Sequence, residues 1–173
     1  MQYAIGESVV HPAHGAGEIV GMEERELVSG FSRYYVIEFL SKRLTMRVPV
    51  RKIDDLGIRA VMSGARAEQV FKTLRKRPDD LPANFKERRQ MVENLIRSGY
   101  PTKIAEAVRE LTWRRQGNHL TKADADLLSQ GWELLSTEIA LTLGCDVVEA
   151  QQRMDVAVAE AIAIGQAHIL PSA

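Results

Sequence analysis

Residues 43–50, Arg-Leu-Thr-Met-Arg-Val-Pro-Val, decide how the first third of the chain folds. Every second residue is apolar, so one face of an extended chain receives Leu44, Met46, Val48 and Val50. This alternation predicts a strand buried on one face. Proline donates no backbone hydrogen bond, so Pro49 predicts that the strand lies at the edge of its sheet.

The segments that precede this strand also predict short strands and tight turns. Residues 31–40 are rich in aromatic and β-branched side chains, and residues 41–43 follow them as the expected turn. Residues 17–28 predict another strand, and a first one is expected over 8–11, with a tight turn at 15–17. Four or five strands within about 60 residues are typical of a small open barrel.

The remainder of the chain predicts helices. A first helix is expected over 65–75, followed by a charged connector that two prolines keep from being helical. Further starts are indicated by N-terminal capping residues or by a proline: Asn84 with Glu87, Pro101, Thr121 with Asp124, and Asp146 with Glu149. The sequence therefore predicts an α+β protein, with a β-barrel over 1–62 followed by an all-helical domain over 63–173.

Charge is distributed unevenly along a chain of 173 residues whose formal net charge is zero. Residues 65–120 hold 13 Lys and Arg against 7 Asp and Glu, whereas residues 121–173 hold 2 against 8. The basic middle could bind nucleic acid. Alternatively, the acidic helices pack beside the basic ones. The longest apolar stretches are too short to span a bilayer, and the N-terminus does not resemble a signal peptide, so we expect a cytoplasmic protein without membrane contact.

No motif in the sequence indicates catalysis. A phosphate-binding loop, a Gly-x-Gly-x-x-Gly turn and a His-Glu-x-x-His helix are all absent from the sequence. His11 and His14 could share a metal, but the favoured interpretation is a turn in which a histidine hydrogen-bonds to the local backbone. Cys145 is the single cysteine and is expected to be a plain buried thiol. We therefore expect no catalytic residue, no metal and no cofactor.

Two arginines are candidates for a protein interface. Arg25 and Arg47 fall on the outward faces of predicted strands. Each could be a solvated surface residue, or its planar guanidinium could pair with carboxylates of a partner. The edge strand that carries Arg47 could also pair with a partner's strand.

Phe85 is a candidate for DNA contact because basic residues surround it. Arg88 and Arg89 lie three and four positions later, hence on its face of the predicted helix, and Lys86 adjoins it. An aromatic ring can wedge between bases while cations hold phosphates. The alternative is that Phe85 belongs to the buried stripe that continues at Val92. Trp113, followed by two arginines, makes a similar case.

Several stretches resemble the CarD/CdnL family of bacterial transcription regulators. The matching stretches, in the family's order and spacing, are Gly6-Glu-Ser-Val-Val-His-Pro-Ala-His-Gly-Ala-Gly-Glu-Ile-Val20, Arg47-Val-Pro-Val50, Gly57-Ile-Arg59, Asn84 with an aromatic residue at 85, and Ile104-Ala-Glu-Ala-Val-Arg-Glu-Leu111. The resemblance extends to about residue 165. The chain has no long basic tail, so it resembles the short CdnL-type members.

The resemblance implies that residues 1–62 form a Tudor-like module that binds the β subunit of RNA polymerase. Arg25 and Arg47 match family positions that contact the polymerase, and Pro49 lies in the same matching stretch. The helical module, residues 63–173, is implied to contact promoter DNA at the upstream edge of the transcription bubble. The implied protein is monomeric and associates with the nucleoid through the polymerase.

The family uses a tryptophan as a minor-groove wedge, and Phe85 occupies that position. Of the family's basic positions after the wedge, only Arg88 carries over; Lys86 and Arg89 are assigned to DNA from their charge. The resemblance predicts stabilisation of the open promoter complex through backbone and minor-groove contacts with little sequence specificity. Two alternatives remain: an adaptor that binds the polymerase without touching DNA, and an enzyme with an unrecognised site.

Overall fold

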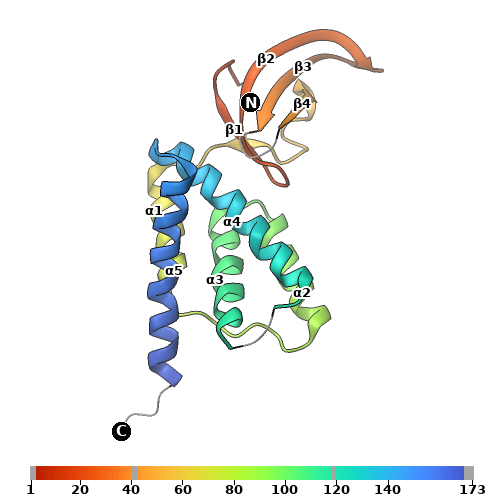
Figure 1. The fold of residues 1–173 in the computed structure, drawn as a ribbon. Helices are drawn as coiled ribbons and strands as arrows, with labels where there is room; N and C mark the ends of the chain where they lie inside the picture. The colour runs from red at the N-terminus through yellow and green to blue at the C-terminus, as the bar shows by residue number, and fades with distance from the viewer. Residues whose placement is uncertain (1–2, 40–42, 118–119, 170–173) are drawn as a thin grey trace. The chain divides into compact units, whose positions relative to one another are not determined.

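A computed structural model describes residues 3–39, 43–117 and 120–169 and confirms the α+β fold class. Strands make up the first part of the chain and helices the second (Figure 1). The chain divides into two compact units, Met1–Val61 and Met62–Ala173, which we call the β unit and the helical unit.

The described strands of the β unit form one antiparallel sheet in the order β4-β3-β2-β1-β5. The bounds are β1 Ser8–His11, β2 Gly15–Val28, β3 Phe31–Phe39, β4 Leu44–Pro49 and β5 Arg59–Ala60. The strand predicted from residues 43–50 is confirmed as β4, and it lies at an edge of the sheet, as Pro49 predicted. Val50 is not part of it, because a single 3-10 turn over Val50–Lys52 begins there.

One face of this sheet holds the core of the β unit. The buried residues that pack together are Tyr3, Val9, Ile19, Tyr35, Ile37, Phe39, Val48, Ile53 and Ile58. The hydroxyl of the fully buried Tyr35 accepts a hydrogen bond of 2.9 Å from the backbone N–H of Tyr3. This bond ties the start of the chain to β3 and satisfies a polar group that burial would otherwise leave unpaired.

The prediction of a tight turn at residues 15–17 is wrong. The turn after β1 is made by residues 12–14, and Gly15 already pairs with His11 as the first residue of β2. The glycine at 17 allows close packing instead of a turn, because a Cβ built there would lie 2.7 Å from the backbone oxygen of Glu38. Of the turn expected at 41–43, residues 41 and 42 lie outside the described residues.

The helical unit contains the helices that the sequence predicted. Their bounds are α1 Gly64–Arg75, α2 Phe85–Arg97, α3 Pro101–Gly117, α4 Lys122–Leu143 and α5 Val147–Ile169. The Thr121 hydroxyl accepts from the N–H of Asp124, and the Asp146 carboxylate accepts from the N–H of Glu149. Ser63 caps α1 in the same way, a cap that the sequence analysis did not identify.

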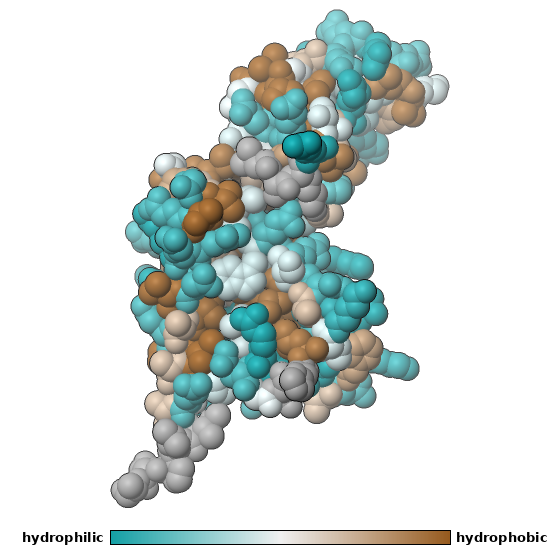
Figure 2. Space-filling view, in the orientation of Figure 1, coloured by the Kyte–Doolittle hydropathy of each residue, from teal (hydrophilic) through white to brown (hydrophobic). Residues whose placement is uncertain are grey.

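Helices α1 and α5 lie side by side, and α3 packs against α4, α1 and α2 (Figure 1). Apolar residues from all five helices meet in one core that includes Leu74, Val92, Val108, Leu135 and Met154. Hydrophilic side chains cover much of the face drawn in Figure 2, with apolar ones between them. Within the described parts of the chain, none of the helices is both long and apolar enough to cross a membrane.

Replacing Gly17 by alanine is expected to destabilise the β unit by about 1–3 kcal/mol, because the backbone of β3 cannot move away from the added methyl group. Gly21→Ala is the matched control. It lies on the same strand, and its Cβ would meet only the Val36 side chain at 4.0 Å. Amide hydrogen exchange in β2 and β3 measures the loss of stability caused by each substitution. Equal protection of these strands in the two variants would contradict the steric explanation.

Candidate functional site

The two arginines predicted at a protein interface converge on one carboxylate. Arg47 Nε donates to both carboxylate oxygens of Glu23, at 2.9 and 3.1 Å, and Arg25 Nε lies 3.3 Å from the same group. The hydrogen bond from Arg47 holds the pKa of Glu23 below its ordinary value. Both guanidinium groups remain about half exposed, so Glu23 orients them without covering them.

Pro49 lies two residues beyond Arg47 on β4, hence on the same face of the sheet. Its partner across the ladder is Tyr34, which is buried on this face. The Tyr34 hydroxyl donates to the Phe31 carbonyl and accepts from the Val28 N–H. Among the described strands β4 pairs with β3 alone, so its other edge can accept a further strand.

Phe85 is the first residue of α2, and 43% of its surface is exposed. Val92 and Ile96 of the same helix are buried, so the alternative that Phe85 belongs to their core stripe is wrong. The Asn84 side chain accepts from the N–H groups of Lys86 and Glu87, at 2.9 and 3.3 Å, which sets the start of the helix. The ring therefore projects from a capped first turn.

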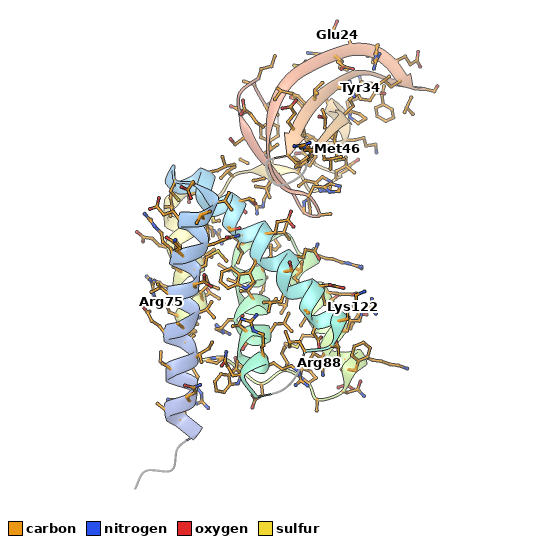
Figure 3. The ribbon with its side chains drawn as sticks, viewed as in Figure 1. Glu24, Tyr34, Met46, Arg75, Arg88 and Lys122 are labelled. Carbon is orange, nitrogen blue, oxygen red and sulfur yellow. The ribbon has the colours of Figure 1, made fainter. Side chains whose placement is uncertain are left out.

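Arg88 does not project towards solvent with Phe85, which corrects its assignment to DNA contact. Only 3% of its side chain is exposed, and its Nε lies 3.2 Å from a carboxylate oxygen of Asp124, which is fully buried. Its Nη1 donates to the carbonyls of Pro82 and Ala83, at 3.0 Å each. Arg88 thus reaches from α2 to Asp124 of α4, and Figure 3 labels it near the ends of these two helices. A guanidinium with these partners holds structure together and is not available to a phosphate.

Arg88 nevertheless contacts the ring of Phe85. Its guanidinium carbon lies 5.8 Å from the centroid of the Phe85 ring, within the range of a cation–π contact. One side of the ring thus rests on a buried cation, which limits the directions in which the ring can turn. Arg88, which the family resemblance had assigned to DNA contact, therefore supports the Phe85 ring instead.

A second buried ion pair holds the other end of the connector between α1 and α2. Arg109 and Glu110, neighbours on α3, are in direct contact. Arg109 Nη1 donates to the Thr73 carbonyl near the end of α1, at 2.7 Å, and Glu110 accepts from the N–H of Asp79 at 2.7 Å. Burial raises the pKa of Glu110, against the opposing effect of Arg109. The connector is therefore attached to the core at both ends.

Lys86 and Arg89 are exposed, as a DNA-contact role requires. Arg89 Nε donates to Glu93, one turn later, at 2.8 Å, and this bond holds the pKa of Glu93 below its ordinary value. An exposed ion pair of this kind contributes little to stability, so Arg89 can exchange Glu93 for a phosphate with little loss of free energy. Sequence reasoning did not assign ion-pair roles to Glu23, Asp124, Arg109 or Glu110, although charged residues between apolar Val108 and Leu111 were a signal for the last two.

His11 is placed as the turn interpretation expected, whereas Cys145 is more exposed than expected. His11 Nδ1 accepts from the N–H of Ala13 at 3.0 Å, which is backbone hydrogen bonding within the turn. The described residues contain no cluster of three or more groups that could hold a metal ion. Cys145 is free and half-buried instead of buried, and it packs against the helical core.

The chain combines an antiparallel β unit that carries an exposed arginine pair with a helical unit that carries an exposed aromatic residue. Two family models match it: CarD-like/TRCF RID domain over residues 3–62, and CarD, C-terminal domain, over residues 69–155. The chain therefore belongs to the CarD family of transcription factors, and its first part to the RNA polymerase-interacting domains.

A curated relative from Bacillus subtilis (strain 168) carries the name "Putative transcription factor YdeB". It is 28% identical over 142 residues, which cover 82% of this chain and 93% of the relative. The resemblance to CarD and CdnL proteins, read from separate short stretches, is confirmed over both units.

Asp124→Asn is expected to lower the free energy of unfolding of the helical unit by about 3–5 kcal/mol, because it leaves the Arg88 charge buried without its carboxylate. Arg153→Gln removes an exposed pair with Glu149 and should cost about 1 kcal/mol or less. Both tryptophans lie in the helical unit, so their fluorescence during urea unfolding measures it. A similar decrease in the free energy of unfolding in both variants would show that the buried pair contributes no more than an exposed one.

Proposed function

We propose that this CarD-family transcription factor binds the β subunit of RNA polymerase through the β unit and promoter DNA through the helical unit, at the upstream edge of the transcription bubble. There it stabilises the open complex. The observation that carries the proposal is the position of Phe85, an exposed ring at the capped first turn of α2 that rests on the buried Arg88.

The polymerase contact is supported by three features on one face and one edge of the β unit. Arg25 and Arg47 are held together by Glu23 and keep their guanidinium groups exposed. Pro49 follows on the same face of β4. The outer edge of β4 can add a strand of a partner, with main-chain hydrogen bonds for affinity and the arginines for specificity.

The DNA contact is proposed for Phe85, Lys86 and Arg89, and no longer for Arg88. The ring would enter the minor groove at a step already opened by melting, and the two cations would hold the adjacent phosphates. Phenylalanine offers less stacking area than the family's tryptophan and no N–H to donate. We therefore propose a shape-dependent contact with little sequence specificity.

Weak DNA contacts suffice when the protein is tethered to the polymerase. Binding through the β unit raises the local concentration of the helical unit at the fork. A ligand that prefers the open over the closed complex by about 1.4 kcal/mol shifts their ratio about tenfold. We propose that the protein acts as a monomer in the cytoplasm, at the nucleoid through the polymerase.

Phe85→Ala is expected to shorten the lifetime of open promoter complexes to that measured without the protein, and Phe85→Trp to lengthen it, because stacking area sets the wedge's preference for the open state. Met91→Ala is the matched control, since Met91 is equally exposed on the same helix. Lifetimes are measured at fixed salt with competitor DNA. A lifetime that Phe85→Ala leaves unchanged, with polymerase still bound, would support the adaptor function instead.

Arg47→Ala is expected to weaken binding to RNA polymerase by about tenfold or more, since exposed arginines oriented by a carboxylate are typical interface anchors. Arg33→Ala is the control. Arg33 is an exposed arginine of the same sheet, paired with Glu24, whose strand position puts it on the opposite face. The affinity of each variant is measured with RNA polymerase immobilised on a sensor surface. Equal affinities for the two variants would remove the arginine pair from the interface.

A further inference from the structure

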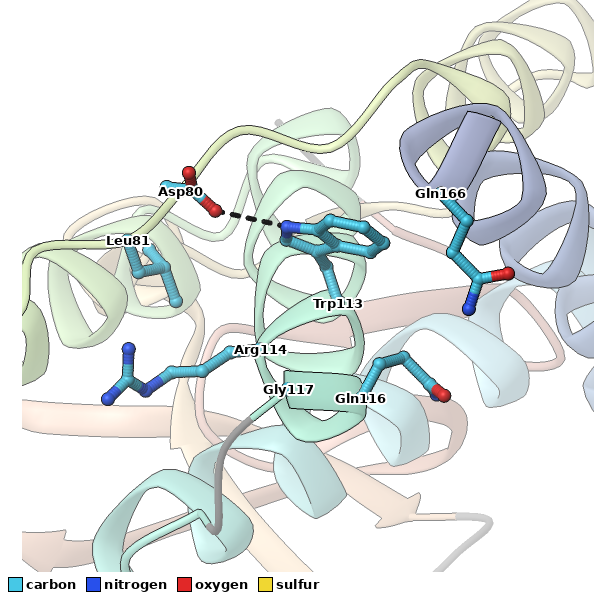
Figure 4. A pocket seen from close by; sticks show the side chains of 7 residues that line it. All are labelled: Asp80, Leu81, Trp113, Arg114, Gln116, Gly117 and Gln166. Atoms are coloured by element: carbon cyan, nitrogen blue, oxygen red, sulfur yellow. Dashed lines mark hydrogen bonds between the residues drawn. The ribbon is translucent and has the colours of Figure 1, made fainter. Parts of the chain in front are cut away.

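A pocket of about 510 Å³ lies in the helical unit at the C-terminal end of α3. Its lining comes from the connector (Asp80 and Leu81), from α3 (Trp113, Arg114, Gln116 and Gly117) and from α5 (Gln166) (Figure 4). The volume falls within the range of about 300–1,000 Å³ that small-molecule sites occupy. Trp113 and Arg114 were named from the sequence as a further candidate for DNA contact, but none of the lining residues belongs to the two contacts proposed above.

The indole of Trp113 is held in one orientation. Its Nε1–H donates to Asp80 at 3.1 Å, the bond drawn in Figure 4. Its far edge presses on α5, because a Cβ built on Gly165 would lie 2.9 Å from two of the ring carbons. The side chain is half-buried, so part of it remains accessible. A fixed and partly accessible ring is a stacking surface that loses little entropy when a planar ligand binds.

Arg114 supplies a charged donor without a partner. Its Nε is buried and makes no hydrogen bond with any described residue. An unsatisfied buried donor is unusual in folded proteins and is destabilising unless an acceptor reaches it. The acceptor that best complements a guanidinium is an anionic oxygen of a phosphate or carboxylate.

The other polar groups of the pocket suit the edge of a heterocyclic base. Gln116 and Gln166 each carry a carboxamide that both donates and accepts; in Figure 4 Gln116 lies below the indole and Gln166 to its right. Asp80 adds a carboxylate, which accepts only. Stacking on an aromatic ring together with amide contacts to the base edge is how proteins bind unpaired nucleotides.

We propose that this pocket binds a nucleobase carrying a phosphate, with the base against Trp113 and the phosphate on Arg114. The ligand is either a free nucleotide or an unpaired nucleotide of a nucleic-acid strand. This site adds to the proposed function and does not need it, because Phe85 lies outside the pocket.

Trp113 itself reports binding when Trp132→Phe makes it the single tryptophan of the full-length protein. The probes are adenosine 5′-monophosphate, adenosine, inorganic phosphate and a short single-stranded deoxyoligonucleotide. We expect saturable quenching by the monophosphate or by the oligonucleotide, and which of them quenches identifies the source of the ligand. Arg114→Gln should weaken it about tenfold or more, as loss of a hydrogen bond to a charged group does.

Two further variants keep the test independent of folding. Arg115→Gln removes the neighbouring exposed cation and should leave quenching unchanged. Gln166→Glu changes an exposed residue of the lining. Because the new carboxylate repels a phosphate, it should weaken binding of the monophosphate more than binding of adenosine. Absence of saturable quenching by either nucleotide probe, equal losses in the Arg114 and Arg115 variants, or full competition by inorganic phosphate alone would overturn the proposal. Quenching that persists in Phe85→Ala would separate this site from the wedge.

Discussion

The helical unit depends on two buried arginine–carboxylate contacts, Arg88 with Asp124 and Arg109 with Glu110. Each arginine also donates to backbone carbonyls, and Glu110 accepts from the backbone N–H of Asp79. These bonds satisfy the polar backbone of a proline-containing connector that cannot be helical. Buried ion pairs gain little net stability, but removing one partner leaves a charge in the core. The pairs therefore specify one path for the chain between α1 and α2.

That path decides where the candidate wedge lies. Phe85 follows the connector directly, and its ring rests on the same guanidinium that binds the connector's last carbonyls. A side chain held in this way loses less conformational freedom on binding any partner, so more of the contact energy is left for affinity. In the β unit Glu23 has the corresponding effect, because it aligns two exposed arginines without covering them. Both candidate surfaces are thus oriented before a partner arrives.

The sequence predicted most of the fold because its signals are local. Alternation in 43–50, the proline at 101 and the caps at Asn84, Thr121 and Asp146 each depend on residues within one turn or one strand, and the structure confirms them. The turn expected at 15–17 was wrong because glycine also marks close packing. Gly17 is small because a distant backbone oxygen, that of Glu38, lies against it. No local pattern distinguishes these two uses of glycine.

The candidate site was predicted less well, for the same reason. The sequence by itself determined the α+β class and the family, because periodicity and motif spacing are properties of the chain, and it named Phe85, Arg25, Arg47 and Pro49 as candidates. Only the tertiary structure decided that Phe85 is exposed while Arg88 is buried, although both were predicted to share a helix face. The physical reason is that Asp124, 36 positions away, lies beside Arg88 and compensates its charge in the core.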